Sequence, residues 1–223
     1  MGKFFLFYII WRITGNPILA IIVLLMIYYV VDRRYIGLLP SVLNPFRKRV
    51  RMSRLQKQLD INPHDMSAKY ELAQAYIEAR QPKRALELLQ AMPASMQDSE
   101  DVLYHTGLCH LSLGDMEVGE TLILRALALN SRLHYGEPYL KLATAFANVF
   151  PAKAMHWFEQ FEADNFSSCE CYYRKGLLHL QLGNRDKAKQ EWKKCLEIYR
   201  TLPNFRKRSE RRWVLAARLK LML

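Results

Sequence analysis

The chain has 223 residues, of which 51% are apolar and 24% are charged, so it is long enough for one or two domains with a sizeable core. Its four cysteines are too few for a disulfide scaffold. The net charge of +12 is uneven, because residues 1–57 carry +9, residues 204–223 carry +6 and the stretch between them carries −3. Nucleic-acid-binding proteins more often spread basic residues over the folded body, so this distribution favours a membrane surface and argues against nucleic acid.

An apolar run near the N-terminus predicts a membrane anchor. Residues 17–31, PILAIIVLLMIYYVV, carry no charge and are almost wholly apolar. We expect a transmembrane helix over about 17–36, within an anchor that spans residues 1–39. A cleaved signal peptide is the weaker alternative, because no small-residue cleavage site follows the run.

The run itself is too short to span a bilayer. Fifteen helical residues rise only about 22 Å, whereas the hydrocarbon core is about 30 Å thick. The helix can extend back through Trp11 with Arg12 reaching the interface, or forward to about Leu39. Residues 4–11 either join the span or lie at the interface.

Basic residues gather on the C-terminal side of the anchor, so the positive-inside rule predicts that this side and the body are cytoplasmic. Residues 40–62 form a basic juxtamembrane linker that becomes helical from about residue 46. The side chains that we expect near anionic lipid headgroups are Arg33, Arg34, Arg47, Lys48, Arg49 and Arg51. An ordinary solvated helix face is the alternative.

The body contains an internal repeat. YHTGLCHLSLGD at 104–115 recurs as YRKGLLHLQLGN at 173–184, 69 residues later. Half of that distance is about 34 residues, the period of the tetratricopeptide repeat, a helix–turn–helix unit. The small residues Ala73, Gly107, Ala143 and Gly176 recur at steps of 34, 36 and 33 residues.

Residues 63–203 therefore resemble the tetratricopeptide repeat family. Four copies fall at about 66–97, 100–131, 136–166 and 169–200. The resemblance implies an all-α solenoid in which small residues let the paired helices approach, and glycines of the two Leu-Gly turns end helices. We expect the least regular turn near Pro151.

Residues 204–223 predict one more helix, which is basic. A terminal helix that caps the exposed end of a solenoid is the favoured interpretation. A basic helix that lies on a membrane or on an acidic partner is the alternative.

The sequence predicts no enzyme, no metal site, no cofactor and no small-molecule substrate. GDMEVGET at 114–121 has Glu120 where a phosphate-binding loop needs lysine. Cys169 and Cys171 lack the further ligands that a zinc site requires. Neither an HExxH nor a GxSxG motif occurs.

The resemblance implies a protein or peptide partner, held in a concave groove that the first helix of each repeat lines. The expected groove residues are Tyr70, Gln74, Ile77, Tyr104, Leu108, Leu111, Leu140, Thr144, Asn148, Tyr173, Leu177 and Leu180. We therefore expect a membrane-tethered scaffold that recruits a partner at the cytoplasmic face. Two alternatives stay open: an envelope-assembly factor that faces outside the cytoplasm, and a peripheral module whose basic ends bind anionic lipid.

Overall fold

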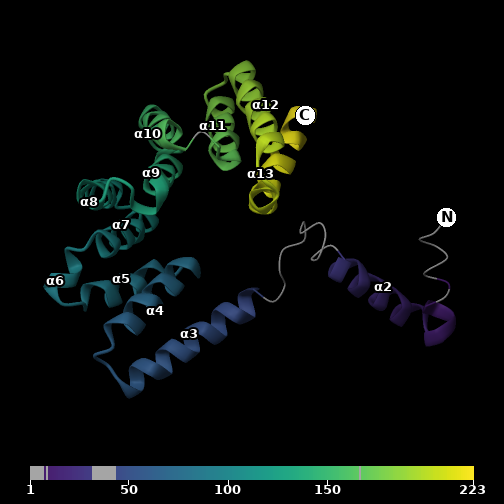
Figure 1. Cartoon of the computed structure of the whole chain (residues 1–223), viewed down its shortest axis with the longest axis horizontal. Helices are drawn as coiled ribbons and strands as arrows, with labels where there is room; N and C mark the ends of the chain where they lie inside the picture. Colours follow the sequence, from purple (N-terminus) through teal and green to yellow (C-terminus); the bar gives the residue numbers. More distant parts are fainter. Residues whose placement is uncertain (1–7, 9, 32–43, 166) are drawn as a thin grey trace. The chain divides into compact units, whose positions relative to one another are not determined.

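The computed structural model describes residues 8, 10–31, 44–165 and 167–223, and every regular element in these ranges is helical (Figure 1). The chain divides into two compact units, Met1–Asn44 and Pro45–Leu223. We call them the N-terminal unit and the body. The prediction of an all-α fold is confirmed for the described residues.

The N-terminal unit contains α2 (Pro17–Val31), which begins after Gly15 takes a positive φ of 66°. The Asn16 Oδ1 atom accepts a hydrogen bond from the backbone N–H of Ile18 at 2.9 Å and so caps the first turn. The exposed side chains of α2 include Ile18, Leu19, Ile21, Ile22, Leu25 and Met26. Residues 32–36 of the predicted span lie outside the described residues. Among the helices that the structure describes, none combines the length and the apolar character needed to cross a membrane.

The body begins with α3 (Asn44–Ile61), followed by helices that pack as successive antiparallel pairs. The pairs follow one another along an arc (Figure 1). Their bounds are α4 (Met66–Glu78) with α5 (Pro82–Gln90), α7 (Glu100–Leu113) with α8 (Met116–Leu129), α9 (Glu137–Phe146) with α10 (Pro151–Asp164), and α11 (Cys169–Gln181) with α12 (Arg185–Thr201). The short α6 (Ala94–Gln97) and η2 (Leu133–Gly136) lie between pairs, and α13 (Asn204–Met222) ends the body.

The small residues found in the sequence lie where paired helices touch. Ala73 of α4 and Ala85 of α5 are fully buried, as are Ala143 of α9 and Ala154 of α10. A side chain that is only a methyl group or a hydrogen lets the two helices of a pair approach closely. Larger neighbouring side chains then fill the space between pairs at the density of a protein core. This packing is the physical origin of the period of about 34 residues.

The glycine turns between helices agree with the sequence prediction, whereas the turn at Pro151 does not. Gly114 and Gly183 both take positive φ, 98° and 78°, and end their helices as predicted. The prediction of an irregular turn at Pro151 is wrong, because Pro151 simply occupies the first turn of α10. The least regular backbone is the connector before α9, where His134 and Tyr135 take φ of 45° and 53°.

The last helix covers the end of the body. Val214 and Ala217 of α13 are buried against the α11/α12 pair. The Oε2 atom of Glu210 is buried, and burial raises the pKa of this carboxyl group. This helix therefore packs as a cap on the fourth helical pair.

Candidate protein-binding groove

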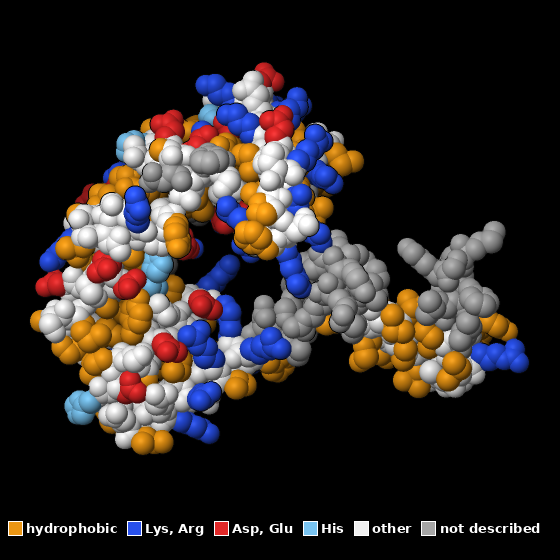
Figure 2. Space-filling view, in the orientation of Figure 1, with side chains coloured by type: hydrophobic (Ala, Val, Ile, Leu, Met, Phe, Trp, Pro, Cys, Tyr) orange, Lys and Arg blue, Asp and Glu red, His pale blue; other side chains and the backbone are white. Residues whose placement is uncertain are grey.

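The first helices of the pairs form one side of the body. In Figure 1, α4, α7, α9 and α11 lie toward the inside of the arc, with α8 and α10 on its outside. Figure 2 shows the surface hollowed on this inner side, with hydrophobic, basic and histidine side chains at its edge. The inner side is the surface on which the sequence places partner binding.

Eight of the twelve predicted groove residues are half-buried, which leaves part of each side chain available for contact. They are Tyr70, Gln74, Ile77, Leu108, Thr144, Tyr173, Leu177 and Leu180. The four first helices each contribute at least one of them. A partner that followed the inner side could therefore touch every pair.

The other four predicted groove residues require correction. Tyr104, Leu111 and Leu140 are only 3%, 8% and 8% exposed, because they fill the core between the second and third pairs. Asn148 is exposed but lies in the turn after α9, since that helix ends at Phe146. The three buried residues therefore have little surface for a partner, whereas Asn148 can offer contact only from the turn.

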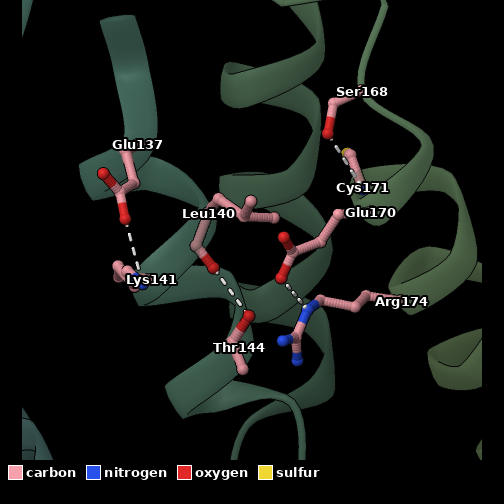
Figure 3. A network of polar contacts seen from close by, with 8 residues as sticks. All are labelled: Glu137, Leu140, Lys141, Thr144, Ser168, Glu170, Cys171 and Arg174. Carbon is pink, nitrogen blue, oxygen red and sulfur yellow. Dashed lines mark hydrogen bonds and ion pairs between the residues drawn. The ribbon is translucent and has the colours of Figure 1, made fainter. Parts of the chain in front are cut away.

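Two ion pairs lie on the first helices of the third and fourth repeats. Glu137 and Lys141 form an ion pair of 3.0 Å on α9, and Glu170 and Arg174 form one of 2.7 Å on α11 (Figure 3). Each pair joins an acid in the first turn of the helix to a base one turn later. The signal was present in the sequence, because both members recur 33 residues apart, the same step as the small residues.

The N-terminal half of the groove carries a polar cluster around His105 of α7. Its Nδ1 atom lies 2.8 Å from the carbonyl oxygen of Asp101, which can only accept, so Nδ1 carries the hydrogen. Nδ1 also lies 3.0 Å from the Tyr70 hydroxyl, and Gln74 Nε2 donates toward Nε2 at 3.5 Å. Burial lowers the pKa of His105, so the ring is neutral near pH 7. Burial and the charge of Asp101 raise the pKa of Tyr70 to about 12.

The C-terminal half carries an aromatic and cationic cluster that extends onto α13. The guanidinium of Arg174 lies 4.9 Å from the ring centroid of Trp213, and that of Arg212 lies 4.6 Å from it. The ring of Tyr173 is 5.6 Å away from the same indole. Such cation–π contacts hold the indole in place and connect α13 to α11.

The predicted lipid-headgroup residues separate into three groups. Lys48 pairs with Glu78 at 3.0 Å and Arg51 pairs with Glu71 at 3.3 Å, so these two face α4 and not a membrane. Arg47 and Arg49 are exposed, and Arg33 and Arg34 lie outside the described residues.

The packing of α3 explains why Lys48 and Arg51 face α4 while Arg47 and Arg49 are exposed. Leu55 is buried, and Met52 and Leu59 pack with it against the core of the first pair. The free face of α3 therefore presents another basic set. Arg49, Val50, Ser53, Arg54 and Lys57 line a shallow surface depression of about 500 Å³.

The residues considered for metal, phosphate or thiol chemistry have structural roles in the described part of the chain. No cluster of three metal-ligating side chains occurs among them. Glu120, in the motif that resembles a phosphate loop, is buried and pairs with Lys153 of α10. The four cysteines are free and buried, and burial raises the pKa of Cys109 to about 11 and that of Cys171 to about 12.

Comparison with known proteins agrees with this arrangement. Family models of the tetratricopeptide repeat match residues 52–107 and 170–202. No curated protein sequence matches the chain. The chain therefore contains tetratricopeptide repeats, and the body is a solenoid of the kind that these repeats form.

Solved structures with the same fold support this assignment. TTC0263, a thermophilic TPR protein of Thermus thermophilus, has a TM-score of 0.62 and 19% identity over 82% of this chain and 95% of its own. A crystal structure of MamA has a TM-score of 0.55 and 23% identity over 67% of this chain and 81% of its own. YrrB, described as a TPR protein with an unusual peptide-binding site, has a TM-score of 0.52 and 18% identity over 80% of this chain and 88% of its own.

Proposed function

We propose that the chain is a membrane-tethered scaffold that holds a protein partner in the groove of its repeats. The observation that carries the proposal is the row of half-buried side chains that all four first helices present on one side of the body. Partly exposed tyrosine side chains bind partners well, because they offer a large contact area and lose little conformational entropy. The peptide-binding site named for YrrB, which shares the fold, is consistent with this role.

The chemistry of the groove favours a segment that is both apolar and hydrogen-bonding. Leu108, Leu177 and Leu180 offer apolar contact, while Gln74 and Thr144 offer polar groups between them. An extended peptide or an amphipathic helix combines these properties. We propose binding alone, with no catalytic step.

The groove is tested by a bulky charge at its centre. Thr144→Arg on α9 places a long cation among the half-buried side chains and should weaken partner binding at least tenfold, because a desolvated clash costs more than about 1.4 kcal/mol. The measurement is capture of membrane proteins by the tagged full chain, followed by titration of the captured partner.

Thr121→Arg on α8 is the matched control. Both threonine hydroxyls donate to a carbonyl one turn earlier, Thr144 to Leu140 at 2.7 Å and Thr121 to Glu117 at 2.8 Å. The two substitutions differ in the side of the body that they change and in burial, since Thr144 is half-buried and Thr121 is exposed, so circular dichroism must show that both variants are folded. A partner lost by Thr144→Arg and kept by Thr121→Arg supports the groove, whereas equal retention by both places the binding site elsewhere.

We propose that the N-terminal unit tethers the body to a membrane. The exposed apolar side chains of α2 support this role, because a helix that is apolar all round is stable only where water is excluded. The basic residues that follow α2 in the sequence support a cytoplasmic body. A body on the outer side remains the alternative.

The orientation can be tested with a single exposed thiol. Because the native cysteines are buried, Ser95→Cys on the exposed α6 should be the only position that reacts quickly with a thiol reagent. We expect a membrane-impermeant maleimide to label it only after the cells are permeabilised. The unsubstituted chain is the control for background, and labelling in intact cells would place the body outside.

A further inference from the structure

The outer face of α13 carries apolar side chains that no part of the body covers. Leu215, Leu219 and Met222 are 38%, 60% and 84% exposed. They follow one another at steps of four and three residues, so they form a single stripe along the helix. A capping helix normally presents a polar outer surface to water, and this stripe departs from that rule.

Arginines border the stripe. Arg211, Arg212 and Arg218 lie on the same helix, and Arg212 and Arg218 are exposed. Arg211 is half-buried and its Nε atom donates to the Tyr199 hydroxyl at 3.5 Å, while the guanidinium of Arg212 also contacts the Trp213 ring. Figure 2 shows basic and hydrophobic side chains together over this end of the body. The face is therefore amphipathic and strongly cationic.

No carboxylate side chain offsets this charge on α13. Glu210 is the single acidic residue between residues 204 and 223, and the Oε2 atom of its carboxyl group is buried. Burial raises the pKa of Glu210, in agreement with its inward position. The outer face thus combines apolar and positive side chains, the composition of a helix that lies in the headgroup region of an anionic bilayer.

We propose that the outer face of α13 binds the surface of an anionic lipid bilayer. The leucines and the methionine enter the boundary between headgroups and acyl chains, while the arginines contact lipid phosphates. This contact is additional to the groove and does not depend on partner binding.

Charge complementarity favours the bilayer over other occupants of this face. A second copy would bring α13 against α13 and place arginine against arginine, which is unfavourable. The apolar α2 of the same chain carries no acid, so it cannot neutralise the arginines. An acidic protein would satisfy the charges but would need its own apolar surface to cover the stripe, and it is distinguished by the experiment.

The experiment places a fluorescent probe on the stripe. Met222→Cys, labelled with an environment-sensitive thiol dye, is reconstituted as the full chain into vesicles of phosphatidylcholine alone or with one-third phosphatidylglycerol. Reconstitution keeps the N-terminal unit in every vesicle, so the dye reports only the position of α13. We expect a blue shift, and quenching by an aqueous quencher reduced at least threefold, in the anionic vesicles alone. The same dye on Ser95→Cys should stay in water in both.

Charge reversal then tests the arginines. Arg212→Glu with Arg218→Glu should return the dye to water, because each basic residue near an anionic surface contributes about a fivefold factor to binding. The matched control is Lys83→Glu with Lys187→Glu, two exposed lysines on α5 and α12 that give the same change in net charge. This control should leave the blue shift unchanged.

Four results would overturn the proposal. The dye could be buried equally in neutral vesicles, or exposed in both kinds. Its burial could rise with the ratio of protein to lipid, which would indicate a second copy. The dye could be buried only after an acidic protein from a membrane extract is added, which would indicate a protein partner. An unchanged blue shift after charge reversal would also contradict the role of the arginines.

Discussion

Replacing Gly107 by alanine should destabilise the body by about 2–3 kcal/mol, although alanine is the better helix former by about 1 kcal/mol. A Cβ atom on Gly107 would lie 2.7 Å from Ile123 Cγ1 and 2.8 Å from the carbonyl oxygen of Gly119. The carbonyl oxygen belongs to the backbone of α8, so it cannot rotate away as a side chain could. Helices α7 and α8 would have to separate, and their fully buried neighbour Ile123 would lose its packing.

The measurement is urea unfolding of the full chain in mild detergent, followed by circular dichroism. Ser112→Ala on the exposed side of α7 is the control and should change the free energy of unfolding by less than about 0.5 kcal/mol. Gly119→Ala alters the same contact from the other helix, where a Cβ atom would lie 2.9 Å from the Gly107 carbonyl oxygen. Its effect should therefore not add to that of Gly107→Ala. A loss no larger than that of Ser112→Ala would mean that the two helices can separate without cost.

Close helix contacts of this kind are what made the fold predictable from the sequence. A position that admits only glycine or alanine appears directly as a residue type, and four such positions in phase predict the helical pairs. The turns at Gly114 and Gly183 were predictable for the same reason, because a positive φ restricts the residue to glycine.

The groove was predictable only in part. The repeat pattern places Tyr104, Leu111 and Leu140 at the same positions as half-exposed residues of other repeats. It cannot show that these three fill the core between the second and third pairs, because that depends on how closely successive pairs pack. The orientation of α3 was unpredictable for the same reason. Leu55 is buried against the first pair, so Lys48 and Arg51 face α4.

The connector before α9 had no sequence signal of its own. His134 and Tyr135 take positive φ although neither is glycine, which costs free energy that tertiary contacts must offset. One such contact joins Asn165 Nδ2 to the Tyr135 carbonyl oxygen at 2.6 Å, across 30 residues of sequence. A hydrogen bond between residues so far apart in the sequence cannot be predicted from the local pattern of residue types.

A buried ion pair between the third and fourth pairs was equally invisible in the sequence, and it gives the second large prediction. Lys175 of α11 is only 11% exposed, and its Nζ atom donates to Glu162 of α10 at 2.7 Å and lies 3.8 Å from Glu191 of α12. Lys175→Met should destabilise the body by about 3–4 kcal/mol at pH 7, because it removes the only lysine that pairs with Glu162 among the described residues and one of the two that lie near Glu191, in a poorly solvated place. Removing one partner of a buried pair costs more than the pair itself contributes.

Lys194→Met is the matched control. Lys194 also lies 3.8 Å from Glu191, but its side chain is 52% exposed, so water replaces the lost charge. We expect its effect on the free energy of unfolding to be below about 1 kcal/mol. Equal decreases in the free energy of unfolding for Lys175→Met and Lys194→Met would mean that burial does not strengthen the ion pairs of Lys175.

The pH dependence distinguishes a charge effect from a simple loss of packing. Burial raises the pKa of Glu162, but hydrogen bonds from Lys175 and Tyr172 and the charge of Lys175 outweigh it, so this pKa lies below its usual value of 4.5. A depressed carboxyl pKa stabilises the native state above the unfolded pKa, and the contribution is lost as pH falls through the folded value. In Lys175→Met the Glu162 carboxylate loses its hydrogen-bonded cation and binds a proton at higher pH, which relieves its buried charge. The difference between the unsubstituted chain and Lys175→Met should therefore narrow as the pH falls from 7 toward 4.5, in urea unfolding measured across that range. A constant difference would show that the lysine stabilises the body through packing alone.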